Sequence, residues 1–260
     1  MEKKHIIILL SALCAILAAG TGAVVLLTRT PSSRETACAE NVARLQEMET
    51  ADISSIEKQL NELKKQDQST ATATLLEEGG ILSDVEIKQA FQGSVIIGDS
   101  ITESIVEYGF LDTDVVVSKR GLSIVNADEQ IQTAIGLHPS TIFMAFGSND
   151  LEIYESDSAS FIDAYRTQLQ KLSEALPDSP VYINGILPIL QSTIDEVPAL
   201  GYYPQFNQAL QELCMEMGYT YIDTAYLVND GESMYEPDGE HVIRDYYPKW
   251  LTLMAKTAGL

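Results

Sequence analysis

The sequence predicts an α/β fold with a mainly parallel sheet whose two faces are both covered by helices. Short apolar or β-branched runs alternate with helical stretches in the C-terminal part of the chain, and most of these runs lead to a glycine. The predicted strands are Ser94–Ile97, Val115–Val117, Thr141–Phe146, Val181–Ile183 and Tyr219–Ile222. The predicted helices are Ile101–Tyr108, Asn126–Ile135, Ser158–Leu176, Pro204–Met217 and Ile243–Lys256.

The charge of the chain is concentrated in this α/β part. The 260 residues include 38 acidic and 16 basic side chains, a net charge of −22. Residues 80–260 hold 27 acidic and 8 basic side chains, a net charge of −19. Such a surface argues against a nucleic-acid partner and against charge-driven binding to anionic lipids. Three cysteines in 260 residues exclude a disulfide-stapled scaffold.

Residues 1–34 are predicted to form an N-terminal membrane anchor. Lys3 and Lys4 precede the uncharged run Ile6–Leu27, and its 22 residues would span about 33 Å as a helix. A cleaved secretory signal is the alternative, but its apolar region is usually only about 7–15 residues long. The two lysines favour a cytoplasmic N-terminus. We therefore expect a single-pass protein whose large domain lies outside the cytoplasm.

Residues 35–80 are predicted to form a helical stalk and a linker. The stretch Glu35–Gln66 contains no proline or glycine, and four apolar residues keep coiled-coil spacing over two heptads: Ile53, Ile56, Leu60 and Leu63. A firm coiled-coil prediction needs three to four heptads, and this stretch has only two. We therefore favour a spacer over a homodimer formed through the stalk.

Three candidate site residues follow predicted strands, where parallel sheets place their ligands. Ser100 comes after Gly98-Asp99, and its N–H at a helix start can stabilise an anion; a simple helix cap is the alternative. The Asn149 amide can donate to a developing oxyanion, or can form an ordinary Asx turn. Gly121 lets a backbone N–H approach a ligand closely, or is a loop glycine.

A fourth candidate is a histidine near the C-terminus. Of the three histidines, only His241 has a carboxylate, that of Asp238, at short spacing within a turn. A general base needs such a carboxylate to fix its tautomer and to stabilise the imidazolium. The alternative is an ordinary Pro-Asp-Gly turn before a helix.

Together these residues lie in four motifs: VIIGDSI (Val95–Ile101), RGLSI (Arg120–Ile124), FGSND (Phe146–Asp150) and DGEH (Asp238–His241). On these motifs, residues 81–260 resemble the SGNH, or GDSL-type, hydrolase family. The one departure is Ile101, where the family signature usually has leucine. The resemblance implies a three-layer α/β/α sandwich with about five parallel strands in a flavodoxin-like sheet.

The resemblance also implies a role for each candidate residue. Ser100 matches the nucleophile, His241 the general base and Asp238 its orienting acid. Three groups match the family's oxyanion hole: the backbone N–H groups of Ser100 and Gly121 and the side chain of Asn149. No metal or cofactor is implied, and His and Cys clusters with zinc-like spacing are absent from the sequence.

We therefore expect a serine esterase that hydrolyses an acetyl or short acyl ester through an acyl-enzyme. Tethering at the membrane favours an O-acetylated envelope polysaccharide as the substrate. The alternatives are an O-acyltransferase, a lysophospholipase or thioesterase, and a catalytically silent membrane-tethered adaptor. We further expect Leu187–Tyr203 to cover the site as a lid. Five tyrosines are expected to line a substrate pocket or to be partly buried at the surface: Tyr202, Tyr203, Tyr235, Tyr246 and Tyr247.

Overall fold

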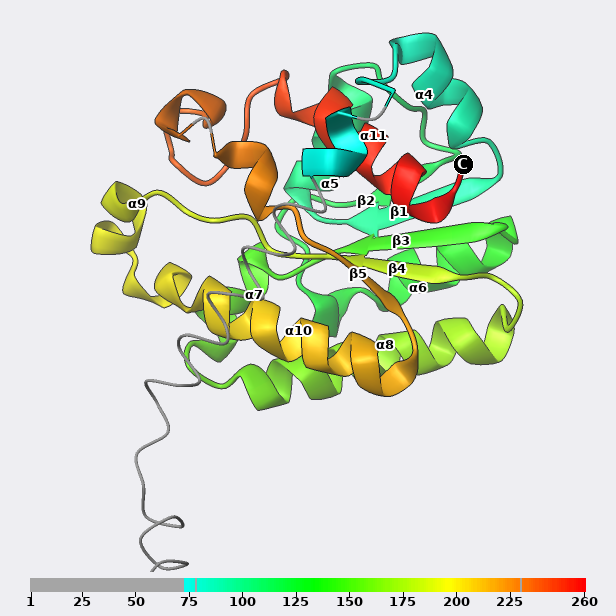
Figure 1. Ribbon diagram of the computed structural model, residues 1–260. Helices are drawn as coiled ribbons and strands as arrows, with labels where there is room; N and C mark the ends of the chain where they lie inside the picture. Colours follow the sequence, from blue (N-terminus) through cyan, green and yellow to red (C-terminus); the bar gives the residue numbers. More distant parts are fainter. Residues whose placement is uncertain (1–72, 78, 230) are drawn as a thin grey trace, which may run out of the picture. The chain divides into compact units, whose positions relative to one another are not determined.

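The computed structural model describes residues 73–77, 79–229 and 231–260. These residues form an α/β domain around a five-stranded sheet in the order β2-β1-β3-β4-β5 (Figure 1). Every neighbouring pair of strands in this sheet is parallel. The strands are β1 (Ser94–Gly98), β2 (Val116–Ser118), β3 (Thr141–Ala145), β4 (Val181–Asn184) and β5 (Thr220–Ile222). The predicted strands and the predicted flavodoxin-like sheet are thus confirmed.

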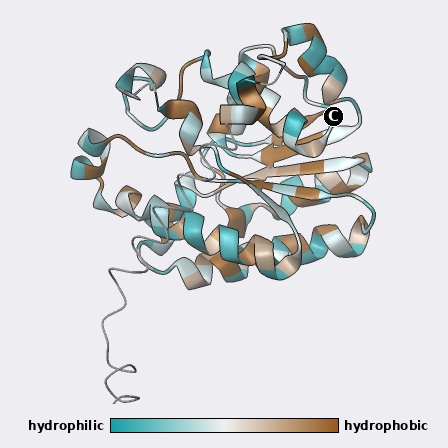
Figure 2. Cartoon of the chain, in the orientation of Figure 1, coloured by the Kyte–Doolittle hydropathy of each residue, from teal (hydrophilic) through white to brown (hydrophobic). Residues whose placement is uncertain are grey.

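The sheet is buried on both faces, which explains why its strands read as short continuous apolar runs. All five residues of β1 are buried. Along β1 the side chains alternate between two hydrophobic clusters: Val95 and Ile97 pack on one face and Ile96 packs on the other. Figure 2 shows the hydrophobic residues of the strands between the two helical layers.

Helices cover each face of the sheet. One layer contains α6 (Asp128–Leu137), α8 (Ser158–Ala175) and α10 (Tyr203–Met217), whose buried residues join the cluster of Val95 and Ile97. The other layer contains α4 (Asp84–Ala90), α5 (Ser100–Glu107) and α11 (Tyr246–Ala258), whose buried residues join the cluster of Ile96. The layers lie below and above the sheet in Figure 1. This is the expected three-layer sandwich.

In the described part of the chain, three short α-helices were not predicted, besides single turns of 3-10 helix. They are α4, α7 (Ser148–Tyr154) and α9 (Gln191–Glu196). Ser83 and Glu86 close a capping box at the start of α4, because each side chain accepts a hydrogen bond from the other residue's backbone N–H. The predicted helix from Ile243 begins instead at Tyr246, since Ile243 pairs its N–H with the carbonyl of Met234.

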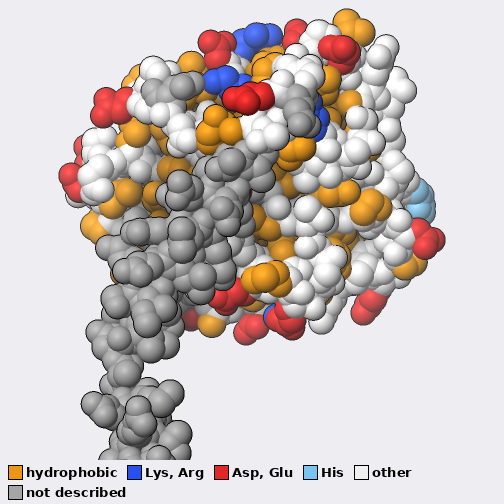
Figure 3. Space-filling view, viewed as in Figure 1, with side chains coloured by type: hydrophobic (Ala, Val, Ile, Leu, Met, Phe, Trp, Pro, Cys, Tyr) orange, Lys and Arg blue, Asp and Glu red, His pale blue; other side chains and the backbone are white. Residues whose placement is uncertain are grey.

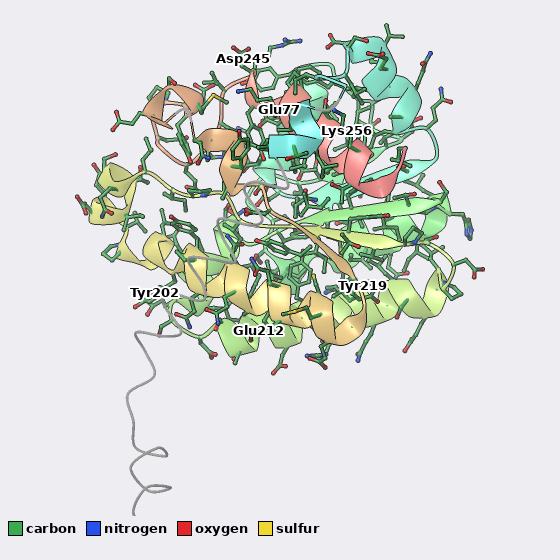
Figure 4. All side chains as sticks on the ribbon, in the orientation of Figure 1. Glu77, Tyr202, Glu212, Tyr219, Asp245 and Lys256 are labelled. Atoms are coloured by element: carbon green, nitrogen blue, oxygen red, sulfur yellow. The ribbon has the colours of Figure 1, made fainter. Side chains whose placement is uncertain are left out.

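The N-terminal predictions fall largely outside the described residues. Residues 73–77 are helical. Lys256 of α11 donates to the carbonyl of Leu75 in this helix and to the carbonyl of Gly80 after it, and Figure 4 shows Lys256 near Glu77. The predicted anchor, including Ile6–Leu27, and the heptads at 53–63 lie in the part of the chain that the structure does not describe. Among the described residues, no helix has both the length and the apolar character to cross a membrane.

Order along the sheet determines where a site can form. The chain passes from β1 outward to β2 and then returns to β3 on the other side of β1. The register aligns Gly98 of β1 with Ser118 of β2 and Ala145 of β3. The loops after these three strands therefore meet at the carboxyl edge of the sheet, at the topological switch point where parallel α/β folds bind ligands.

Candidate active site

Ser100 is the first residue of α5, directly after the end of β1. The helix is capped by Asp99, whose Oδ1 accepts the N–H of Ile101 at 3.1 Å, so the alternative that Ser100 caps this helix is wrong. The Ser100 hydroxyl oxygen lies 2.9 Å from Nε2 of His241. A serine hydroxyl at a helix N-terminus, bonded to an imidazole, has the arrangement of an activated nucleophile.

His241 is in turn held by Asp238. Its Nδ1 lies 2.8 Å from Oδ2 of Asp238, while Oδ1 of Asp238 accepts the backbone N–H groups of Glu240 and His241 at 3.0 and 2.9 Å. Partial burial acts to raise the pKa of Asp238, but these N–H donors and the His241 side chain outweigh it and lower the pKa below its usual value. An ionised Asp238 accepts a hydrogen bond from Nδ1–H of His241, which leaves Nε2 unprotonated and able to accept the hydroxyl of Ser100.

Asn149, in the first turn of α7, joins two of the other motifs. Its Nδ2 donates to Oδ2 of Asp99 at 3.3 Å and to the carbonyl of Leu122 at 3.4 Å. The amide of Asn149 therefore lies between the residue before Ser100 and the residue after Gly121. The alternative of an Asx turn at Asn149 is not found, because the residue lies in helix α7.

Gly121 occupies the third position of a tight turn after β2. The N–H of Leu122 donates to the carbonyl of Lys119 at 3.1 Å, and Gly121 has a φ of +71°. A type II turn needs a positive φ at this position, which glycine adopts without strain. Gly121 is exposed, so its N–H belongs to a loop that solvent and a substrate can both reach.

Two buried carboxyl groups lie behind these residues. The carboxylate of Asp150, which is fully buried, accepts the N–H of Ile124 at 3.0 and 3.2 Å. Burial raises the pKa of Asp150 to about 7, although the Ile124 N–H opposes the rise. Burial likewise raises the pKa of Asp99 to about 7, against the lowering effect of its bond to Ile101. Burial therefore shifts each carboxyl group toward its neutral form.

An open cleft of about 500 Å³ lies beside Ser100 and His241. Arg120 at its edge pairs with Glu107 at 2.9 Å and with Glu103 at 3.3 Å, so its positive charge is already compensated. Tyr108 provides an aromatic wall, and its hydroxyl lies 3.5 Å from Oε1 of Glu236. The cleft is lined by Ser100, Ser104, Tyr108, Arg120, Glu236, Pro237, Asp238, His241 and Val242.

The tyrosines named from the sequence are not the ones that line this cleft. Tyr235, Tyr246 and Tyr247 are at most 8 % exposed and belong to the hydrophobic core, so the prediction of a surface position for them was wrong. Tyr246 does border a small cavity that also contacts Asp99. Tyr202 lies at the surface, with 37 % of its area exposed (Figure 4). Tyr108 was missed, because its place at the end of a predicted helix gave no signal of a site.

Within residues 73–77, 79–229 and 231–260, no group of three or more His, Cys, Asp or Glu side chains is placed to hold a metal ion. The surface around the domain carries many acidic and few basic side chains, as Figure 3 shows for one face.

The arrangement of Ser100, His241 and Asp238, with Gly121 and Asn149 nearby, can activate a serine hydroxyl and can stabilise an oxyanion.

Comparison with known proteins agrees with this chemistry. The model of the GDSL-like lipase/acylhydrolase family matches residues 96–244. This range contains Ser100, Gly121, Asn149, Asp238 and His241. A search of curated protein sequences found no significant match.

Solved structures of similar fold come from several bacteria. A protein assigned as an acylhydrolase from Bacteroides fragilis has a TM-score of 0.52 at 14% identity, covering 64% of this chain and 86% of its own. A GDSL-like lipase from Bacteroides thetaiotaomicron has a TM-score of 0.52 at 14% identity, covering 74% and 98%. A protein from Streptococcus pneumoniae assigned as a platelet activating factor has a TM-score of 0.52 at 19% identity, covering 78% and 98%. At these identities the likeness establishes the fold.

Proposed function

The chain belongs to the GDSL-like lipase/acylhydrolase family and is a serine hydrolase of ester bonds, and we propose that Ser100, His241 and Asp238 form its catalytic triad. The observation that carries this assignment is one continuous hydrogen-bonded chain. Ser100 Oγ lies 2.9 Å from Nε2 of His241, and Nδ1 of His241 lies 2.8 Å from Oδ2 of Asp238. Distances of this size suit direct proton transfer from a nucleophile to its base.

In the proposed mechanism, Nε2 of His241 takes the hydroxyl proton as Oγ of Ser100 attacks the ester carbonyl. The tetrahedral oxyanion is bound by the backbone N–H groups of Ser100 and Gly121 and by Nδ2 of Asn149, which exchanges its long 3.4 Å bond to the carbonyl of Leu122 for the bond to the oxyanion. His241 then gives its proton to the leaving alkoxide, and an acyl-Ser100 ester remains. Water, deprotonated by His241, attacks this ester, and the acid leaves while the proton returns to Ser100.

We propose an acetyl or other short acyl ester of an uncharged carbohydrate as the substrate. The cleft beside Ser100 is open and lined about equally by polar and apolar surface, and its apolar side chains are Pro237, Val242 and the ring of Tyr108. Such a surface suits a sugar with one aromatic contact, and it offers little to a long alkyl chain. Glu236 and Asp238 also make the cleft unfavourable for a phosphate-bearing lipid, since Arg120 is already paired.

The location that we propose follows from the sequence. The apolar run Ile6–Leu27 would anchor the chain in the membrane, and residues 35–80 would hold residues 81–260 away from it on the outer side. An O-acetylated envelope polysaccharide is then within reach. A protease applied to intact cells should release the domain, whereas cleavage that requires lysis would place the domain in the cytoplasm.

The substrate proposal is tested with the full chain in detergent against p-nitrophenyl acetate, butyrate and octanoate, and against O-acetylated and de-acetylated polysaccharide. We expect the ratio kcat/KM to fall as the acyl chain lengthens and free acetate to appear only from the acetylated polymer. A preference for octanoate would favour a lipase. Transfer of the acetyl group to an added oligosaccharide, seen by mass spectrometry, would identify an O-acyltransferase that uses the same acyl-enzyme.

A further inference from the structure

The residues that hold His241 form a short loop, which we call the acid–base loop (residues 236–241). The loop is closed on itself, because the N–H of Glu236 donates to the carbonyl of His241 at 2.8 Å and the N–H of Gly239 donates to the carbonyl of Glu236 at 2.9 Å. Burial does not fix its two proposed catalytic side chains. Those of Asp238 and His241 are 52% and 40% exposed.

A second segment fastens the acid–base loop from outside. We call it the α9 segment (residues 188–196), and it lies in the connection that leads from β4 to α10. Thr193 Oγ1 donates to the carbonyl of Asp238 at 2.7 Å, and the N–H of Leu190 donates to the carbonyl of Gly239 at 3.0 Å. The hydroxyl of Tyr235, just before the loop, donates to the carbonyl of Pro188 at 2.6 Å.

The contact between the two segments is close as well as hydrogen-bonded. Gly239 has a φ of +70°, and a Cβ at this position would lie 2.3 Å from Oγ1 of Thr193 and 3.1 Å from Cβ of Leu190. A glycine is therefore required for its backbone conformation and for the approach of Thr193. None of the residues Leu187–Tyr203 lines the cleft beside Ser100, so this connection does not cover that cleft as the expected lid, and it contacts the acid–base loop instead.

The α9 segment can serve as a support because partly buried apolar side chains attach it to the core, although no residue of α9 is fully buried. Ile194 packs against the buried cluster on one face of the sheet, and Leu190 packs against the cluster on the other face. The N–H groups of Thr193 and Ile194 both donate to the carbonyl of Leu190, at 3.0 and 3.1 Å, which fixes the first turn of α9. The hydroxyl of Thr193 thus extends from an ordered element toward an exposed loop.

We propose that Thr193 is a positioning residue that holds Asp238 and His241 in line with Ser100; this proposal rests on the triad proposed above. Ser100 is fixed by β1 and α5, whereas His241 comes from a loop 141 positions later in the chain. The bond between them needs that loop to be held relative to the sheet. Thr193 supplies this hold at the backbone of Asp238, the residue whose side chain orients the imidazole.

The test compares Thr193→Val, which keeps the shape of the side chain but removes its donor, with Thr193→Ser, which keeps the donor. Ser192→Ala is the matched control, since Ser192 is an exposed neighbour on the same short helix. Kinetics with p-nitrophenyl acetate are measured on the full chain in detergent. Misalignment by about 1 Å can reduce turnover by up to about 100-fold. We expect kcat to fall about 5- to 50-fold in Thr193→Val with KM within about 2-fold, and to stay within about 3-fold in Thr193→Ser.

A spectroscopic measurement separates positioning from general stability. The proton between Nδ1 of His241 and Asp238 should give a low-field ¹H resonance in the wild type, in Thr193→Ser and in Ser192→Ala. It should broaden or disappear in Thr193→Val at temperatures well below the unfolding midpoint of that variant. A sharp resonance together with unchanged kcat in Thr193→Val would overturn the proposal. So would a kcat loss that Thr193→Ser shares.

The same assay distinguishes this proposal from the assignment on which it rests. Ester turnover that depends on Ser100 but is indifferent to Thr193→Val would overturn the positioning role alone. Turnover that survives Ser100→Ala would overturn both the triad and the role of Thr193. Gly239→Ala provides a second variant, and because its Cβ would displace Thr193 we expect a loss of kcat at least as large as that of Thr193→Val.

Discussion

Both carboxylate oxygens of Asp150 accept the backbone N–H of Ile124, at 3.0 and 3.2 Å. This contact joins the start of α7, which carries Asn149, to the segment that follows Gly121. Two of the three proposed oxyanion donors are therefore held together by a buried carboxyl group. Burial of this carboxyl group makes the stability of the protein depend on pH.

The first prediction concerns Asp150→Asn and pH. Burial raises the pKa of Asp150 to about 7 in the folded protein, above the value near 3.9 of an unfolded aspartate. The folded state thus favours the protonated form, and the stability that this carboxyl contributes is present below about pH 4 and is lost as the pH rises through about 7. Asparagine at this position does not titrate. The stability advantage of the wild type over the variant should therefore shrink by about 1–3 kcal/mol between pH 5 and pH 8.

Differential scanning calorimetry at pH 5 and pH 8 measures this change. Asp245→Asn is the control, because Asp245 is exposed at the start of α11 (Figure 4). An advantage of the wild type that stays constant or grows toward pH 8 would contradict a pKa of Asp150 that burial has raised.

The second prediction concerns the oxyanion. Asn149→Ala removes an amide that is proposed to bind the developing charge, and loss of one such donor typically costs about 100- to 1,000-fold in kcat. Steady-state kinetics with p-nitrophenyl acetate should show this loss with KM nearly unchanged. Asn126→Ala, which removes an amide bonded to Ser123 on the neighbouring loop, should retain kcat within about 3-fold. Equal kcat values for the two variants would exclude Asn149 from the oxyanion hole.

The third prediction concerns the orienting acid. In Asp238→Asn, the new amide can donate to Nδ1 of His241 and so favours the tautomer whose Nε2 carries the proton. That nitrogen can then no longer accept the hydroxyl of Ser100. We expect kcat to fall by about 100- to 10,000-fold, with the melting temperature lowered only slightly, since Asp238 is half exposed. Turnover within 5-fold of the wild type would contradict the proposed role of Asp238.

The fourth prediction concerns the core beneath the site. Nε1 of Trp250 donates to Oδ1 of Asn184 at 2.9 Å, and Nδ2 of Asn184 donates to the carbonyl of Met144 at 3.1 Å. All three residues are buried. Trp250→Phe leaves Oδ1 of Asn184 without its donor and should lower the free energy of unfolding by about 1–3 kcal/mol. Denaturant unfolding gives this value, and a change below about 0.5 kcal/mol would show that the bond contributes little.

The sheet could be predicted from sequence to within one or two residues at each strand end. Buried parallel strands need apolar side chains on both faces, so each strand stands out as a short continuous run between polar loops. The long helices α8 and α10 were equally clear. The missed helices have six or seven residues each, too short for a periodic pattern. Ser83 and Glu86 gave a capping signal that would have located α4.

The site was only partly visible in the sequence. Ser100, Asn149 and His241 could be selected from the order of the motifs, because the proposed chemistry belongs to their side chains. Thr193 and Leu190 donate hydrogen bonds to backbone carbonyls of the acid–base loop. Every residue type has a backbone carbonyl, so the sequence does not reveal which residues accept such bonds. Tyr246 and Tyr247 were misassigned because α11 is buried along almost its whole length, so its tyrosines fill the core.

The triad assignment is tested most directly by labelling the full chain in detergent with a fluorophosphonate, which reacts with an activated serine. We predict one label per chain, located on Ser100 by peptide mass spectrometry. The label should be absent from Ser100→Ala and unchanged in Ser192→Ala. Labelling of Ser100→Ala at the rate of the wild type, or a wild type that takes no label, would contradict a nucleophilic Ser100.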